Sequence, residues 1–112
     1  MLDMETKIFN IISHGGDAKA IAYEALELAH AYNFSEAEKK LEKANQTLVK
    51  AHNTQTKLIQ AEINGEKVSM SLLMVHAQDH LMAAISEMTL IEKMITMLKK
   101  IYQLEKNLQG KG

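Results

Sequence analysis

Two histidines, one aspartate and one glutamine fall within five consecutive positions of a stretch that is otherwise mostly apolar. The stretch covers residues 72–84, and its polar part reads His76-Ala77-Gln78-Asp79-His80. If it is helical, His76, Asp79 and His80 project from one side, because residues three and four positions apart are neighbours on a helix surface. A helix that keeps ionisable groups on one side either exposes that side to water or uses those groups for binding or catalysis.

Zinc hydrolysis is one chemistry for this stretch, because its pattern has the outline of the inverted zincin motif His-x-x-Glu-His. Histidines four residues apart on a helix can bind one zinc ion. The acidic position, however, holds Asp79 where that motif has glutamate, which disfavours this interpretation. A second interpretation is structural, with one histidine in the core and the other in water, and it stays open at this point.

Phosphoryl carriage is the third interpretation. Imidazole is nucleophilic near neutral pH, because its pKa is about 6.5. A carrier needs one accessible ring nitrogen, and it needs no nucleotide-binding loop if another protein delivers the phosphoryl group. The sequence has no glycine-rich phosphate loop, and Met70, Met74 and Met82 form an apolar surround for the histidines. Methionine-rich surfaces suit the docking of more than one protein partner.

The composition predicts a single all-α domain over residues 1–112. Hydrophobic residues make up 46% of the chain but aromatic residues only 4%, and proline is absent. Most of the chain consists of the strong helix formers Ala, Leu, Met, Glu, Lys and Gln. All 13 basic residues are lysines, balanced by 14 acidic residues for a net charge of −1, which argues against nucleic-acid binding. There is no cysteine, no signal-peptide pattern and no apolar run long enough for a membrane span, so we expect a cytoplasmic protein.

The hydrophobic pattern predicts helices at about 3–31, 35–63 and 70–107 in an antiparallel three-helix bundle. The first carries a stripe of small residues that predicts close packing on a neighbour, and Gly15-Gly16 predicts a kink, a close contact or a tolerated weak spot. A capping box at Ser35-Glu36-Ala37-Glu38 begins the second helix and Asn64-Gly65 ends it, while Ser69 or Ser71 caps the third. The small-residue stripe consists of Gly15, Ala18, Ala22, Ala25 and Ala29.

A polar patch interrupts the apolar seam of the second predicted helix at residues 52–56. It is either a solvated face or a polar wall opposite the His76 stretch. On the second interpretation, His52 or Gln55 orients or hydrogen-bonds the His76 site, within one chain or from a neighbouring copy.

The third predicted helix has more apolar rows than two neighbouring helices can cover. Besides its core seam, one row contains Leu73, Met94, Ile101 and Leu108, and another contains Ala83, Leu90, Met97 and Leu104. Such excess hydrophobic surface predicts self-association through this helix.

Three stretches of the sequence resemble the enzyme IIA proteins of the bacterial phosphotransferase system, lactose/cellobiose (N,N′-diacetylchitobiose) family. The active-site segment of that family is similar to residues 75–82, Val-His-Ala-Gln-Asp-His-Leu-Met. Gly16-Asp17-Ala18 and the segment Ala51-His52-Asn53-Thr54-Gln55-Thr56 match family patterns in the first and second helices, in the same order and spacing. Ala77, where lactose-type members have glycine, favours the cellobiose/chitobiose side.

The resemblance implies a three-helix bundle that assembles as a homotrimer. It implies that His76 accepts a phosphoryl group from the phosphocarrier protein HPr and passes it to a cysteine of the cognate enzyme IIB. It also implies that Asp79 meets its two symmetry mates around one divalent cation per trimer, for which oxygen ligands favour Mg²⁺. We expect Gln78, His80 and Gln55 to support the reaction at His76. The alternatives are a regulatory binding module and a purely structural helical oligomer.

Overall fold

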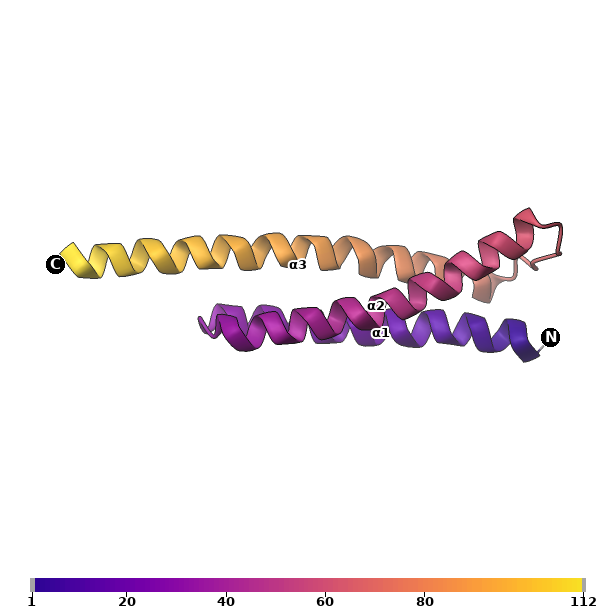
Figure 1. Ribbon diagram of the computed structural model, residues 1–112, viewed down its shortest axis with the longest axis horizontal. Helices are drawn as coiled ribbons and strands as arrows, with labels where there is room; N and C mark the ends of the chain where they lie inside the picture. The colour runs from indigo at the N-terminus through magenta and orange to yellow at the C-terminus, as the bar shows by residue number, and fades with distance from the viewer. Residues whose placement is uncertain (1, 112) are drawn as a thin grey trace.

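Three α-helices form the protein in a computed structural model that describes residues 2–111 (Figure 1). Helix α1 spans Leu2–His30, α2 spans Phe34–Ile63 and α3 spans Leu72–Lys111. Successive helices run in opposite directions, and no strand occurs within the described residues. The predicted antiparallel three-helix bundle is confirmed. It is elongated, with extents of 67 × 20 × 19 Å.

The turn between α1 and α2 differs from the predicted capping box. Asn33 is the N-cap of α2 and makes no side-chain capping bond, and the helix has already begun at Phe34, so Ser35 lies inside it. The backbone sets this entry: the Tyr32 N–H donates to Ala29 O at 3.0 Å and the Asn33 N–H to Leu28 O at 2.9 Å. These two bonds and the positive φ of 64° at Tyr32 form a Schellman-type helix end.

Ring contacts hold Tyr32 in its left-handed conformation, which is strained for a residue with a side chain. Its ring centroid lies 4.9 Å from that of Tyr102 on α3 and 6.0 Å from that of Phe34. This aromatic cluster therefore joins the α1–α2 turn to α3.

The turn from α2 to α3 follows the sequence signals. Asn64 caps the end of α2, and Gly65 has φ +90°, a conformation that favours glycine. At the start of α3, the Met74 N–H donates to Ser71 Oγ at 3.1 Å. Of the two serines predicted as caps, Ser71 is the one that acts.

The core depends on the difference in side-chain size between the helices. The four alanines of the small-residue stripe of α1 and three alanines of α2 are fully buried, so the backbones of α1 and α2 approach closely. Helix α3 fills the remaining space with larger residues. These are Met74, Leu81, Met88, Ile91 and Ile95.

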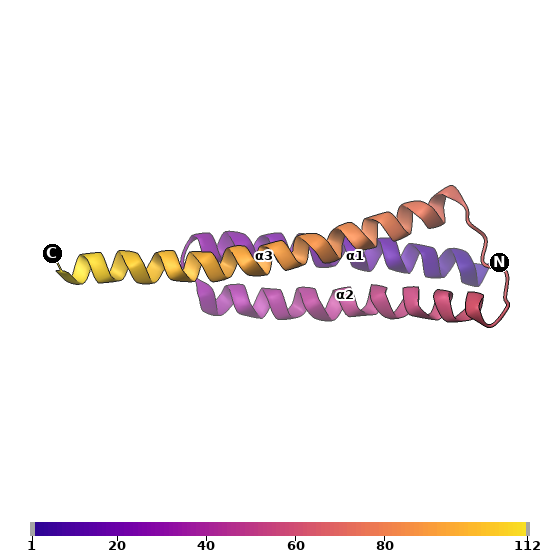
Figure 2. The same cartoon turned by 90° about the horizontal axis from the view of Figure 1, so that it is seen from above.

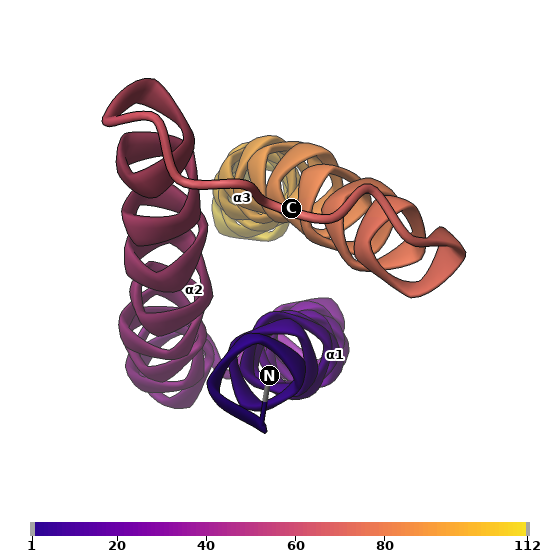
Figure 3. The same ribbon diagram turned by 90° about the vertical axis from the view of Figure 1, so that its right-hand side faces the viewer.

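Helix α1 packs along both other helices, whereas α2 and α3 contact each other only sparsely (Figure 3). Because Tyr102 is level with the α1–α2 turn, the rest of α3 projects beyond the other two helices (Figure 2). The predicted apolar excess on α3 is confirmed by six exposed residues at alternating spacings of four and three, here called the outer seam. They are Leu90, Met94, Met97, Ile101, Leu104 and Leu108.

Candidate functional site

His76 and His80 lie side by side on the first half of α3. Their ring planes are inclined by 21° and their centroids are 6.0 Å apart. His76 is exposed and His80 is half-buried. The exposed imidazole of His76 is therefore accessible to a partner, and the ring of His80 lies next to it.

His80 rests against α1 at the two adjacent glycines. A Cβ atom on Gly16 would lie 3.3 Å from His80 Nε2, and one on Gly15 would lie 3.7 Å from His80 Cδ2 and 3.9 Å from the Cα of Leu81. Helix α1 continues without interruption through both glycines. Of the predicted outcomes for this pair, the close contact is therefore the one that occurs, and it occurs beside the candidate site.

Gln78 faces the opposite side of α3 from the histidines. Its side-chain oxygen accepts a hydrogen bond of 2.5 Å from Nε2 of Gln55, which is 9% exposed on α2. The reason is the helical period: His76 and Gln78 are two residues apart, hence about 200° around the axis. Within one chain, Gln55 and Gln78 therefore form a separate pair and do not contact the histidines.

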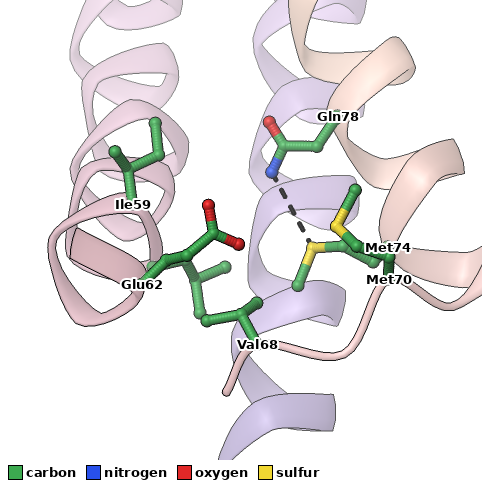
Figure 4. Close-up of a pocket in the computed structure, with 7 residues that line it drawn as sticks. Ile59, Glu62, Val68, Met70, Met74 and Gln78 are labelled. Atoms are coloured by element: carbon green, nitrogen blue, oxygen red, sulfur yellow. Dashed lines mark hydrogen bonds between the residues drawn. The ribbon is translucent and has the colours of Figure 1, made fainter. Parts of the chain in front are cut away.

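Figure 4 shows where Gln78 lies, at a cavity of about 160 Å³ between the end of α2 and the start of α3. Leu58, Ile59, Val68, Met70 and Met74 line this cavity together with Glu62. The Gln78 Nε2 also lies 3.8 Å from the sulfur of Met74. Met74 is buried here, whereas Met70 and Met82 are exposed, so only part of the predicted methionine surround reaches the surface.

Asp79 points away from the bundle. It lies about 200° around α3 from the buried Ala77, and its side chain is exposed. On a straight helix with 3.6 residues per turn, Asp79 lies on the same side of α3 as the residues of the outer seam. No group of three histidine, cysteine or acidic side chains within the described residues of one chain could hold a metal ion.

An ion-pair cluster that the sequence pattern did not predict lies further along the contact between α1 and α3. The Tyr23 hydroxyl donates to Glu87 Oε1 at 2.5 Å, and Lys19 Nζ is 3.0 Å from Glu87 Oε2. The hydrogen bonds from Tyr23 and Lys19 hold the pKa of Glu87 below its ordinary value, and the charge of His80 acts in the same direction. The spacing of seven residues from His80 to Glu87 was the available signal, because it places both on one side of α3.

A comparison with known families identifies the chain. Residues 6–99 match the family described as the lactose/cellobiose-specific IIA subunit of the PTS system. The chain belongs to this family. It is a component of a sugar phosphotransferase system, as the sequence resemblance predicted.

Relatives of this enzyme IIA protein share most of its length. The lichenan-specific phosphotransferase enzyme IIA component of Bacillus subtilis is 48% identical over 99 residues, covering 88% of this chain and 90% of that protein. The cellobiose-specific enzyme IIA from Bacillus anthracis has a crystal structure that matches with a TM-score of 0.88 at 40% identity, covering 92% and 94% of the two chains.

A third match was solved together with a partner. The IIA(Chitobiose) protein of Escherichia coli, in complex with HPr, matches with a TM-score of 0.76 at 33% identity and covers 88% of this chain and 96% of that chain. Among the described residues of this enzyme IIA protein, no helix is long and apolar enough to cross a membrane.

Proposed function

We propose that this enzyme IIA protein accepts a phosphoryl group on His76 from phosphorylated HPr and passes it to a cysteine of the cognate enzyme IIB. The proposal places the protein in the cytoplasm and in the uptake of a sugar of the lactose, cellobiose or chitobiose type. The observation that carries it is the exposed imidazole of His76, which stands beside the ring of His80 on a largely apolar helix.

Both transfers exchange one phosphorus bond for another. A ring nitrogen of His76 attacks phosphorus as the bond between phosphorus and the side chain of HPr breaks, and the new P–N bond later breaks as phosphorus bonds to the cysteine sulfur. Such transfers depend on in-line positioning and on stabilising the charge of the phosphoryl oxygens. The exposed ring of His76 is open to in-line approach, and the ring of His80, whose centroid lies 6.0 Å away, can donate a hydrogen bond.

We include a homotrimer in the proposal, with α3 facing the axis. The outer seam supports self-association, because its residues expose 44% to 72% of their surface and repeat at the spacing of a coiled coil. The resemblance sets the expected number of copies at three. Asp79 continues this face of α3, so it would approach its two symmetry mates.

This arrangement gives the pair of Gln55 and Gln78 a role. His76 lies about 60° to one side of Asp79 and Gln78 about 100° to the other. When Asp79 faces a threefold axis, the His76 side of one copy faces the Gln78 side of the next. A site completed between neighbouring copies then brings the amide groups of Gln55 and Gln78 toward His76.

Replacing Gln55 tests that role. Gln55→Leu fills the same buried space but removes the donor to Gln78, so we expect phosphoryl acceptance to fall about tenfold, as when a supporting partner is lost. The melting temperature should change little, because Gln78 is half-buried and can bond to water. Stopped-flow phosphorylation measures the rate, and Gln60→Leu, at an exposed position on α2, is the control. An unchanged rate would mean that the pair of Gln55 and Gln78 has no part in phosphoryl transfer.

Asp79 fits a shared cation. Its exposed carboxylate lies on the apolar face proposed for the axis, where three such groups repel one another unless a cation or protonation balances them. The three Asp79 carboxylates would hold the ion, whose chemistry there is charge neutralisation, and oxygen ligands favour Mg²⁺ or Ca²⁺.

The metal proposal predicts that Asp79→Asn lowers the bound divalent cation from one per trimer to none, while far-ultraviolet circular dichroism is unchanged. The control is Glu66→Gln, which alters an exposed acid in the α2–α3 turn. Elemental analysis after dialysis measures the stoichiometry. An Asp79→Asn protein that retains its cation would show that the ligands lie elsewhere.

The overall function is tested by intact mass after incubation with phosphoenolpyruvate, enzyme I and HPr. A gain of one phosphoryl group per chain supports the carrier. No gain under conditions that phosphorylate HPr favours a regulatory module or a structural oligomer instead.

A further inference from the structure

Gly16 lies where α1 meets the candidate site, although as a glycine it has no side chain that could take part in the reaction. It is a residue of an unbroken helix, so its backbone conformation does not require glycine, and alanine would favour the helix. The residue type therefore needs an explanation outside the conformation of α1.

The contact with His80 supplies that explanation. A Cβ at position 16 would lie 3.3 Å from His80 Nε2, which is tighter than an ordinary carbon–nitrogen contact. Because Leu81 is fully buried and fixes the adjoining backbone of α3, the imidazole rather than the helix has to move. The ring of His80 would shift by a few tenths of an ångström or rotate away from α1.

The displaced ring would carry the consequence to His76. The two imidazoles are inclined by only 21° with centroids 6.0 Å apart, so the position of the His80 ring bounds the orientations open to the exposed ring of His76. Phosphoryl transfer requires an aligned nucleophile, and misplacement by 1 Å can slow a reaction about 100-fold.

We propose that Gly16 is a positioning residue for phosphoryl transfer, because its missing Cβ lets the His80 imidazole lie against α1 and thereby orient His76. This inference rests on the proposed role of His76 as acceptor. It assigns Gly16 no contact with the phosphoryl group or with the reacting atoms.

Alanine substitutions at the two adjacent glycines provide a matched test. Gly16→Ala should slow phosphoryl acceptance about three- to tenfold, and Gly16→Val, which adds further bulk toward the ring, about 100-fold. Gly15→Ala should leave the rate within about twofold, because its Cβ meets His80 and Leu81 at ordinary contact distances of 3.7 and 3.9 Å. The melting temperature of Gly16→Ala should equal or exceed that of the wild type.

A double-mutant cycle with His80→Ala separates positioning from a general structural effect. If Gly16 acts through the His80 ring, Gly16→Ala has no further effect on the rate when that ring is absent. An equal loss of rate in both backgrounds, or an equal loss in Gly15→Ala, overturns the proposal.

NMR of the imidazole rings adds a readout that needs no phosphorylation. The ring resonances of His80 should move in Gly16→Ala and stay in place in Gly15→Ala, and unmoved resonances in Gly16→Ala overturn the contact itself. If the wild-type protein accepts no phosphoryl group at His76, the proposed function fails, and this result is distinct from a failure of the Gly16 contact.

Discussion

Replacing His76 with glutamine is expected to abolish phosphoryl acceptance while the helices and their assembly remain. Glutamine keeps a hydrogen-bonding side chain of similar reach but has no nucleophilic nitrogen, so no P–N bond can form. Because His76 is exposed and lies outside the core, the substitution should change the free energy of unfolding by no more than about 0.5 kcal/mol. The measurement is intact mass after incubation with phosphoenolpyruvate, enzyme I and HPr.

His80→Gln is the informative control, since the second imidazole is one turn away and stacked on the first. We expect this variant still to accept one phosphoryl group, but more slowly, because the side chain next to His76 is altered. The other three histidines have different surroundings: Nδ1 of His14 lies 3.1 Å from the carbonyl oxygen of Asn10 on its own helix, His30 lies at the end of α1, and His52 is exposed on α2. A phosphorylated His76→Gln protein together with an inert His80→Gln protein would mean that the acceptor is His80.

Placing a lysine in the outer seam is expected to dissociate the assembly. The wild-type protein should sediment at three times the 12.6 kDa of one chain, and Leu104→Lys at or near the mass of one chain. Leu104 is 63% exposed in the single chain, so burying it should contribute roughly 1–2 kcal/mol per copy, or about 3–6 kcal/mol per trimer. The loss of this contribution alone should weaken assembly by a factor on the order of 10²–10⁴. The three ammonium groups that Leu104→Lys places near one axis add repulsion.

Gln103→Lys is the matched control, because it adds the same charge one residue earlier, on another side of α3 and outside the outer seam. Sedimentation equilibrium at micromolar concentrations should show that this variant remains assembled. A wild-type protein that sediments as a single chain would refute self-association through the outer seam. Equal dissociation by both lysine variants would instead point to net charge as the cause.

The secondary structure followed from local signals in the sequence. Helix-forming composition, the absence of proline and the predicted boundaries near Ser35 and at Asn64-Gly65 place three helices, because each of these features acts through the backbone of the residues that carry it. The excess of apolar rows on α3 was equally readable, since counting the faces of a helix needs only its period. The capping box at Ser35 failed because the Schellman-type turn at Tyr32, supported by contacts with the distant Tyr102, set the start of α2 instead.

The residues of the candidate site followed from the sequence as well, but the direction in which each side chain points did not. The motif at residues 76–80 brought two histidines, a glutamine and an aspartate together along the chain, and its resemblance to a known family indicated their roles. Only the packing of the helices decided that His80 lies against α1 while His76 is exposed, that Gln78 bonds to Gln55 on α2, and that Asp79 faces away from the bundle. The helical period spreads five consecutive residues around the whole circumference of a helix, so the neighbours of each side chain depend on where the other helices lie. For the same reason, the contact between Gly16 and His80 could not be read from either segment alone: it exists because α1 and α3 approach closely at that level.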